Sequence, residues 1–398
     1  MTDARFTAAV VAAQVLVQIG AFTLPALLPG YMDRWSLSAT EAGWLVGIFF
    51  AAYVVAVPVL VALTDRLPAG RIYLIGAGAT ALSHLGFVVF ADGFWSALAF
   101  RVLGGIGWAG AYMPGLKVLA DRQEGAAQSR AVSWHAAGVG IAGAVSFAVA
   151  GAIDALAGPE AAFLFGGVAA VAAGAIGIAV MPGTAPRTTR SLAAALDFRP
   201  VFRNRAVMAW IAGYTAHTWE LGALRAWGVT FLAAAIALHG APAWLPGPNL
   251  LFTVAGLVGV AISVAGNETA QRLGRARMVA WAMGVGAVFS VAAGFSLLVS
   301  APLAALCVLV WNAAIYLDSA ALTAGTVAAA ERDRRGATMG LHSMCGYAGG
   351  FVGPVAVGMA LDLAGAEAVL GWVLGFGQIA LVTLAGLWAV RRLGRATP

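Results

Sequence analysis

The sequence predicts an all-α polytopic membrane protein with twelve transmembrane helices in two six-helix bundles. Three observations predict this class: the composition, the apolar runs and the distribution of arginine. The chain has 398 residues, of which 61% are hydrophobic and only 10% are charged, and its mean hydropathy is +0.89. Values this apolar lie outside the range of water-soluble domains.

The apolar runs are long enough to be transmembrane helices, which need about 20 residues. They are continuously apolar and do not alternate with period two, and helices satisfy every backbone amide within lipid, so strands are not expected. The first run lacks a small-residue cleavage site, so we expect it to be retained as a span. The expected spans are 7–30, 41–63, 72–91, 94–118, 131–157, 161–182, 206–236, 249–265, 277–299, 302–328, 338–362 and 368–390.

Positive charge occupies alternate gaps between these spans. Nineteen of the 23 Lys and Arg residues lie in one alternate set of gaps, and the other set holds only Arg34. The remaining three, Arg101, Lys117 and Arg225, lie inside apolar runs. Short loops rich in arginine stay on the cytoplasmic side, so we expect a multi-pass protein of the cytoplasmic (inner) membrane with both termini cytoplasmic. The same charge accounts for the basic pI of 9.8 through contact with anionic lipid, and no nucleic acid partner is expected. The residues in the alternate gaps are Arg5, Arg66, Arg71, Arg122, Arg130, Arg187, Arg190, Arg199, Arg203, Arg205, Arg272, Arg275, Arg277, Arg332, Arg334, Arg335, Arg391, Arg392 and Arg395.

The long polar gap predicts the domain organisation. We expect an N-terminal six-helix bundle at 1–182, a cytoplasmic central loop at 183–205 and a C-terminal six-helix bundle at 206–398. A shift of 207 residues places the fifth span on the eleventh, which indicates an internal repeat of the kind that transporters use. The matched pairs are His135 with His342, Gly143 with Gly350, Gly151 with Gly358 and Gly158 with Gly365, while Asp154 and Asp362 are one position out of step.

Three motifs resemble the major facilitator superfamily. The loop after the second span reads Asp65-Arg66-Leu67-Pro68-Ala69-Gly70-Arg71, close to the family's Gly-x-x-x-Asp-Arg-x-Gly-Arg, but with two added residues and Val61 at the leading Gly. The loop after the eighth span repeats it as Gln271-Arg272-Leu273-Gly274-Arg275, with Gln271 in place of the acid. On the fourth span, Arg101-Val102-Leu103-Gly104-Gly105-Ile106-Gly107 matches Arg-x-x-x-Gly-x-Gly.

The resemblance implies a secondary transporter of twelve helices, with gating roles for Asp65, Arg66, Arg71, Arg272 and Arg275. The chain departs from the proton-driven drug antiporters of this superfamily. Their fifth span carries a Gly-Pro-rich motif, whereas here that span has no proline and a Gly353-Pro354 pair stands in the eleventh. This departure lowers the expectation of a multidrug exporter.

Candidate site residues in the N-terminal half lie on the fourth and first spans. Arg101, Trp108 and Tyr112 share one helical face, and a guanidinium suits a carboxylate or phosphate. A structural pairing of Arg101 with a neighbouring helix is the alternative. Gln14 and Gln18 are four residues apart and are expected either to hydrogen-bond a ligand or to join helices.

Candidates in the C-terminal half lie on the seventh span. His217 and Glu220 share one face and Arg225 lies on another, so Glu220 and Arg225 should find partners on other spans or border a wide cavity. Arg225 is close enough to the outer end to snorkel instead. Ionisable groups within a membrane usually face protein or a wet cavity.

The tenth span carries a polar stripe of Asn312, Tyr316, Ser319 and Thr323, with Asp318 beside it. Burial favours the neutral form of a carboxylic acid, which suits a proton-coupling site, and a permanent ion pair is the alternative for Asp318. For the remaining histidines, His84, His135 and His342, we expect satisfied packing within the bundle.

These observations predict a secondary active transporter of a small organic solute, with an anionic group because two arginines lie within spans. Alternating access and proton coupling are expected, with Glu220 favoured over Asp318 as the proton carrier. No nucleotide-binding motif, metal cluster or catalytic nucleophile is found, so we expect no enzyme activity, no cofactor and a monomer whose partners are substrate, proton and lipid bilayer. The alternatives are efflux of amphipathic, drug-like compounds, and a sensor or assembly factor that shares the fold.

Overall fold

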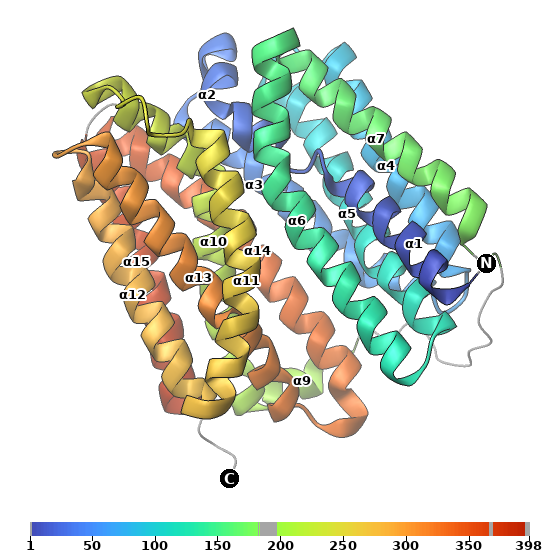
Figure 1. The fold of residues 1–398 in the computed structure, drawn as a ribbon. Coiled ribbons are helices and arrows are strands. Elements are labelled where there is room, and N and C mark those ends of the chain that lie inside the picture. Colours follow the sequence, from blue (N-terminus) through green and yellow to red (C-terminus); the bar gives the residue numbers. More distant parts are fainter. Residues whose placement is uncertain (1, 182, 184–196, 366–368, 395–398) are drawn as a thin grey trace. The chain divides into compact units, whose positions relative to one another are not determined.

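The computed structural model describes residues 2–181, 183, 197–365 and 369–394, and this part of the chain is helical with no strand (Figure 1). The central loop expected at 183–205 lies largely outside the described residues. The helices of the N-terminal half are α1 (Asp3–Gln18), α2 (Thr23–Trp35), α3 (Ala39–Leu63), α4 (Ala69–Phe90), α5 (Phe94–Arg122), α6 (Gly125–Ala157) and α7 (Pro159–Val180). Those of the C-terminal half are α9 (Arg199–Arg203), α10 (Arg205–His239), α11 (Pro248–Leu273), α12 (Arg275–Ser296), α13 (Ala301–Ala329), α14 (Arg335–Ala364) and α15 (Val369–Leu393), with a 3-10 turn at Arg332–Arg334.

Eleven helical stretches of the described chain are long and apolar enough to cross a membrane, with α1 and α2 taken together as one stretch of 33 residues. Helix α5 occupies the remaining expected span; it is 29 residues long, carries Arg101 and Lys117, and is not among these eleven. The all-α class is therefore confirmed, with eleven to twelve apolar helices where twelve spans were expected. Two short elements, α9 and the 3-10 turn, were not expected from the sequence.

The helices form two compact units. Unit 1 comprises Met1–Leu27 and Ala51–Ala195, and unit 2 comprises Leu28–Phe50 and Leu196–Pro398. Helices α2 and α3 contribute residues to both units. The assignment of 1–182 and 206–398 to two six-helix bundles stays a prediction.

Unit 1 brings α4 and α5 together through glycines. A Cβ atom at Gly110 would lie 2.7 Å from the Cα atom of Gly76, so only a hydrogen at each position allows this approach. Helix α7 packs on α4 and α1, and the buried ring of Tyr73 lies in the shared core. Small residues give membrane helices this close packing without a hydrophobic driving force.

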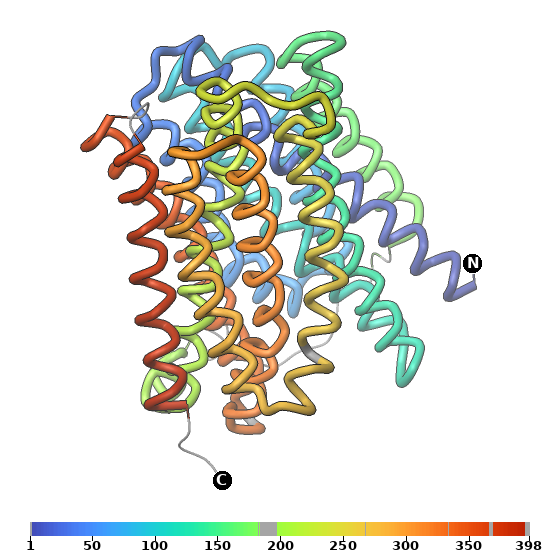
Figure 2. The backbone as a smooth tube through the Cα atoms, turned by 60° about the vertical axis from the view of Figure 1, so that its left-hand side comes forward, coloured from blue at the N-terminus to red at the C-terminus, as the bar shows by residue number. Residues whose placement is uncertain are grey.

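Unit 2 packs α10, α12, α13 and α15 around a common core, and α12, α13 and α15 run side by side (Figures 1 and 2). Trp210, Met283, Leu322 and Leu387 meet in that core. Helix α10 lies along α14 as well, so its polar residues face neighbouring helices on several sides. This arrangement positions the ionisable groups of α10 inside the unit.

The start of α3 is capped by a carboxylate from α14. The backbone nitrogens of Ala39 and Thr40 each donate to Asp362, at 2.8 Å to Oδ1 and Oδ2 respectively. These are first-turn amides that have no partner within their own helix. The two helices then pack closely, because a Cβ at Gly43 would lie 2.5 Å from the carbonyl oxygen of Pro354.

The first expected span, 7–30, is not one continuous helix. It breaks into α1 and α2 at 19–22, and other helices bind backbone groups in the break. Nε2 of His84 lies 3.1 Å from the carbonyl oxygen of Gly20, and the Phe22 amide donates to Oγ of Ser146 at 3.0 Å. Backbone groups released from a helix within a membrane need such partners. The break was not predicted because a run of apolar residues does not report contacts with distant helices.

Candidate functional site

An acid and an imidazole form a buried pair in unit 2. Nδ1 of His217 on α10 lies 2.7 Å from Oδ1 of Asp318 on α13, and both side chains are 2% exposed. When Asp318 is ionised, its carboxylate oxygen accepts, and Nδ1 of the imidazole carries the proton and donates. The pair joins two residues 101 positions apart that were each expected at the site.

Aromatic stacking extends from this pair. The ring of Tyr214 stacks on His217, with centroids 5.5 Å apart, and on His342, with centroids 3.8 Å apart. His342 is in turn bonded to threonine hydroxyls of α13, with Nδ1 3.1 Å from Thr326 and Nε2 3.4 Å from Thr323. Three helices, α10, α13 and α14, thus share one polar cluster.

Glu220 lies one turn beyond His217 and is also buried, at 2% exposure. Its two carboxyl oxygens accept hydrogen bonds from neutral groups: Nε1 of Trp311 at 2.5 Å and Oγ1 of Thr383 at 3.2 Å. Gly286 on α12 gives the carboxyl group its room, because a Cβ there would lie 2.7 Å from Oε1. Glu220 is therefore held by three other helices, α12, α13 and α15.

Arg225 has a separate partner. Nη2 of Arg225 donates to the hydroxyl of Tyr316, and the guanidinium lies 5.8 Å from the centre of that ring. The polar stripe of α13 faces α11 nearby, where Nδ2 of Asn312 donates to the carbonyl oxygen of Ala255 at 2.9 Å. The expectation that Glu220 and Arg225 find partners on other spans is confirmed.

In unit 1, Arg101 is buried on α5, at 4% exposure. Further along this helix, Trp108 meets Phe22 edge to face at 6.5 Å between centroids, and Tyr112 stacks on His135 at 5.8 Å. These contacts place Trp108 beside the break of the first span and Tyr112 against α6.

Several buried polar side chains of unit 1 have no hydrogen-bond partner among the described residues. Four that matter here are Gln14, Gln18, Tyr73 and His135, with seven nitrogen and oxygen atoms between them. Three of the four surround Gly115, since a Cβ there would lie 2.8 Å from Oε1 of Gln14, 3.3 Å from Nε2 of His135 and 3.3 Å from Cδ2 of Tyr73. Buried polar atoms are nearly always hydrogen-bonded, and leaving one unpaired costs about 1–3 kcal/mol. This set is the amide–imidazole cluster.

The histidines separate into two groups. The expectation of satisfied packing holds for His342 and for His84, whose Nδ1 also lies 3.0 Å from the carbonyl oxygen of Thr80. It is wrong for His135, whose two ring nitrogens have no partner among the described residues. The reason is positional: His135 faces Gly115 and Gln14, and no threonine hydroxyl or freed carbonyl meets it there.

Sequence reasoning missed Trp311, Thr383 and Tyr73. Trp311 adjoins Asn312, but an indole in an apolar helix carries no sign that its N–H meets a carboxylate. Thr383 stands alone in an apolar run, and only the packing of α15 against α10 and α12 brings it to Glu220.

The expected gating residues lie at helix connections. Asp65, Arg66 and Arg71 lie at the junction of α3 and α4, and Arg272 and Arg275 at the junction of α11 and α12. Gly274 between the last two has φ +89°, in the left-handed region that favours glycine. The glycine of the second motif copy is thus required by the turn, while gating by the charged residues stays a prediction.

Three solved structures with the same fold are distant from this chain in sequence. A variant of the nucleoside transporter NupG matches with a TM-score of 0.79 at 12% identity, covering 98% of this chain and 99% of that one. A bacterial homologue of the human lysosomal transporter Spinster, in an inward-facing and occupied conformation, matches with a TM-score of 0.78 at 15% identity over 99% and 97%. The human organic anion transporter MFSD10 (TETRAN) matches with a TM-score of 0.71 at 18% identity over 98% and 100%.

No curated protein matches the chain by sequence. The family model of the Major Facilitator Superfamily, however, matches residues 10–354. That stretch covers most of both units and includes Arg101, His217, Glu220, Arg225 and Asp318. The chain therefore belongs to the major facilitator superfamily of membrane transporters.

Proposed function

We propose that this transporter moves a small organic solute with an anionic group across the cytoplasmic membrane by alternating access, coupled to protons. The orientation follows from the arginine-rich loops and places both termini in the cytoplasm. The observation that carries the proposal is the difference between the two buried acids of unit 2. Asp318 has a basic partner at 2.7 Å, whereas both hydrogen-bond donors to Glu220 are neutral.

This difference assigns the proton to Glu220. Asp318 therefore has an imidazole that can share a proton with it inside the low-dielectric surrounding. An ionised Glu220 adds a net negative charge to the same region, which is costly unless water or a cation reaches it. Glu220 therefore binds a proton when the region is closed and releases it when the region is wetted.

The anionic group of the substrate is assigned to Arg225. Its guanidinium is only partly buried, and Nη2 donates to the hydroxyl of Tyr316. A guanidinium offers two parallel donors to a carboxylate or phosphate. The organic anion transporter with the same fold is consistent with such a substrate.

Transport into proteoliposomes tests the proposal. A panel of radiolabelled mono- and dicarboxylates is offered with and without an imposed pH gradient. Wild-type protein should accumulate one of them only with the gradient. Glu220→Gln should abolish accumulation but retain exchange of labelled for unlabelled substrate. Asp318→Asn should instead lower thermal stability, because it leaves His217 without its acid.

Three results would contradict parts of this assignment. Accumulation by Glu220→Gln that still follows the pH gradient removes Glu220 as the carrier. Gradient-driven accumulation by a stable Asp318→Asn variant removes the ion-pair role of Asp318. Absence of transport for every solute, together with a binding response in the purified protein, would favour the sensor alternative.

A second class of substrate is favoured by the amide–imidazole cluster of unit 1. Two carboxamides, an imidazole and a phenol supply both donors and acceptors and no formal charge, which suits a neutral solute rich in such groups. The nucleoside transporter with the same fold is consistent with this class. Uridine uptake that is lost in Gln14→Leu, but kept in Arg225→Gln, would select the neutral class over the anionic one.

A further inference from the structure

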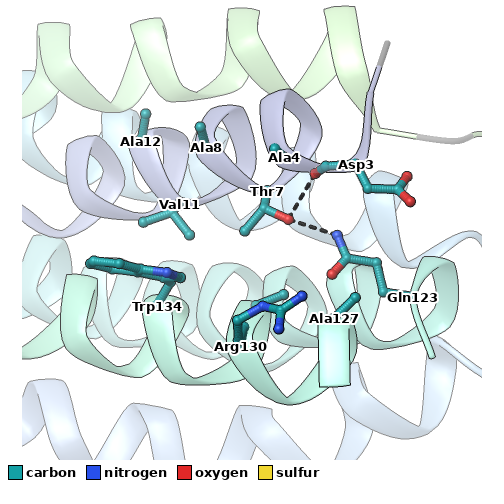
Figure 3. Close-up of a pocket in the computed structure, with 11 residues that line it drawn as sticks. Asp3, Ala4, Thr7, Ala8, Val11, Ala12, Gln123, Ala127, Arg130 and Trp134 are labelled. Carbon is teal, nitrogen blue, oxygen red and sulfur yellow. Dashed lines mark hydrogen bonds between the residues drawn. The ribbon is translucent and has the colours of Figure 1, made fainter. Parts of the chain in front are cut away.

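A cavity of about 570 Å³ lies between α1 and α6 of unit 1, at the Asp3 end of α1 (Figure 3). Its lining changes character along the helices. The polar end is lined by Asp3, Gln123 and Arg130, and the apolar end by Ala8, Val11 and Trp134. Neither the proposed proton site nor the proposed anion site shares any of these residues.

The polar end is held by hydrogen bonds between helices. Nε2 of Gln123 donates to Oγ1 of Thr7 at 2.6 Å, and that hydroxyl donates to the Asp3 carbonyl oxygen at 2.9 Å (Figure 3). The Asp3 carboxylate is balanced by Arg122, whose Nε lies 3.5 Å from Oδ1. Arg130 lines the same end and is exposed. The charge that this end offers to a ligand is therefore the guanidinium of Arg130.

The apolar end is a groove between small side chains. Ala8 is exposed on α1, and the indole of Trp134 lies on α6 next to Val11 with 63% of its surface exposed (Figure 3). The helices come together beyond the groove, where a Cβ at Gly138 would lie 3.2 Å from Cγ1 of Val11. Tryptophan is enriched at the level where hydrocarbon meets water, so this rim lies near the membrane surface.

We infer that the cavity binds one anionic phospholipid, with the phosphate on Arg130 and an acyl chain along Ala8 towards Trp134. The polar end lies at the terminus of a transmembrane helix and the apolar end lies deeper, which is the order of headgroup and chain in a lipid. Basic pockets between transmembrane helices bind anionic headgroups, and a guanidinium pairs with phosphate through two hydrogen bonds. An anionic lipid is preferred to a zwitterionic one because the charged residues of the described lining are Asp3 and Arg130, and Arg122 already pairs with the Asp3 carboxylate.

Native mass spectrometry of the purified protein tests this site. Palmitoyl-oleoyl-phosphatidylglycerol and palmitoyl-oleoyl-phosphatidylcholine are titrated separately, and the apparent Kd of the first bound lipid is compared. Wild-type protein should prefer phosphatidylglycerol. Arg130→Gln should raise the apparent Kd for phosphatidylglycerol by about fivefold, which is the effect of one cation near a membrane surface. It should also remove the preference for phosphatidylglycerol over phosphatidylcholine. Arg5→Gln is the matched control: it removes an exposed arginine of the same helix end that does not line the cavity.

A second variant tests the acyl groove independently. Ala8→Phe fills the groove from an exposed position. It should weaken the binding of phosphatidylglycerol and leave the gel-filtration profile of the protein unchanged. The inference is overturned if phosphatidylcholine binds as tightly as phosphatidylglycerol. It is equally overturned if Arg5→Gln loses as much affinity as Arg130→Gln, since the contact would then be general surface charge, or if Ala8→Phe binds like wild type.

Discussion

A substitution at Arg101 can separate the effect of side-chain shape on transport from the effect of side-chain charge. It is 4% exposed, so its guanidinium makes its contacts inside unit 1. We predict that Arg101→Lys impairs transport although the charge is kept, because an ammonium cannot reproduce a planar fork of donors. Initial uptake rates at matched membrane expression measure the effect, with Arg5→Lys as the exposed control on α1. Wild-type rates in Arg101→Lys would mean that charge alone suffices.

A substitution at Gly286 tests whether the carboxyl group of Glu220 is confined. A methyl group there would lie 2.7 Å from Oε1 of Glu220, so Gly286→Ala should displace the carboxyl group and destabilise the protein by about 1–3 kcal/mol. Gly284→Ala, on the same helix, is the control, because a Cβ there would have no described atom of a neighbouring element within 4 Å. Thermal unfolding in detergent measures both variants. Equal melting temperatures for the two would show that Glu220 is not confined at this position.

Which residues have polar partners inside unit 2 was predictable where charge is scarce. Glu220, Asp318, Arg225 and His217 stand out in an apolar sequence, and all four have polar partners in unit 2. Their pairings were not predictable, because spacing along one helix says nothing about which neighbour faces it. The pairing of His217 with Asp318 depends on how α10 and α13 are rotated against each other.

At the scale of elements, the cap on α3 has a measurable value. Asp362 accepts two first-turn amides from another helix, and loss of a capping acceptor costs about 0.5–2 kcal/mol. We predict that Asp362→Ala lowers the melting temperature and that Asp362→Asn, which keeps one acceptor oxygen, lowers it less. Indistinguishable melting temperatures for wild type and Asp362→Ala would show that water replaces this cap.

The ends of helices show what the sequence can and cannot predict at this scale. The 207-residue repeat matched Gly158 with Gly365, and both end their helices with positive φ, at +88° and +84°. The break between α1 and α2 was missed, because its backbone groups bind His84 and Ser146, which come from other parts of the chain. Local signals therefore predicted where helices stop at turns but not where one opens within the membrane.

At the scale of the whole molecule, the arginine distribution makes a prediction about orientation. In a background with Cys307 and Cys345 replaced, a cysteine at Thr188→Cys should be protected from an impermeant thiol reagent in intact cells. One at Gly240→Cys, in the connection between α10 and α11 on the nearly arginine-free side, should react. Thr188 lies outside the described residues, so this test depends on the charge pattern alone. Labelling at Thr188→Cys from outside would mean that every loop lies on the opposite side of the membrane from the one expected.

The length of helix α10 makes the depth of the buried Glu220 depend on the thickness of the bilayer. It is 35 residues long, or about 52 Å at 1.5 Å per residue, whereas the hydrocarbon core of a bilayer is about 30 Å thick. Such a helix must tilt or project from the lipid, and lipids of different chain length change the balance between the two. Because α10 carries both His217 and Glu220, a thinner or thicker bilayer changes the depth at which these groups lie. The proposed proton site should therefore respond to acyl-chain length even when the headgroup is unchanged.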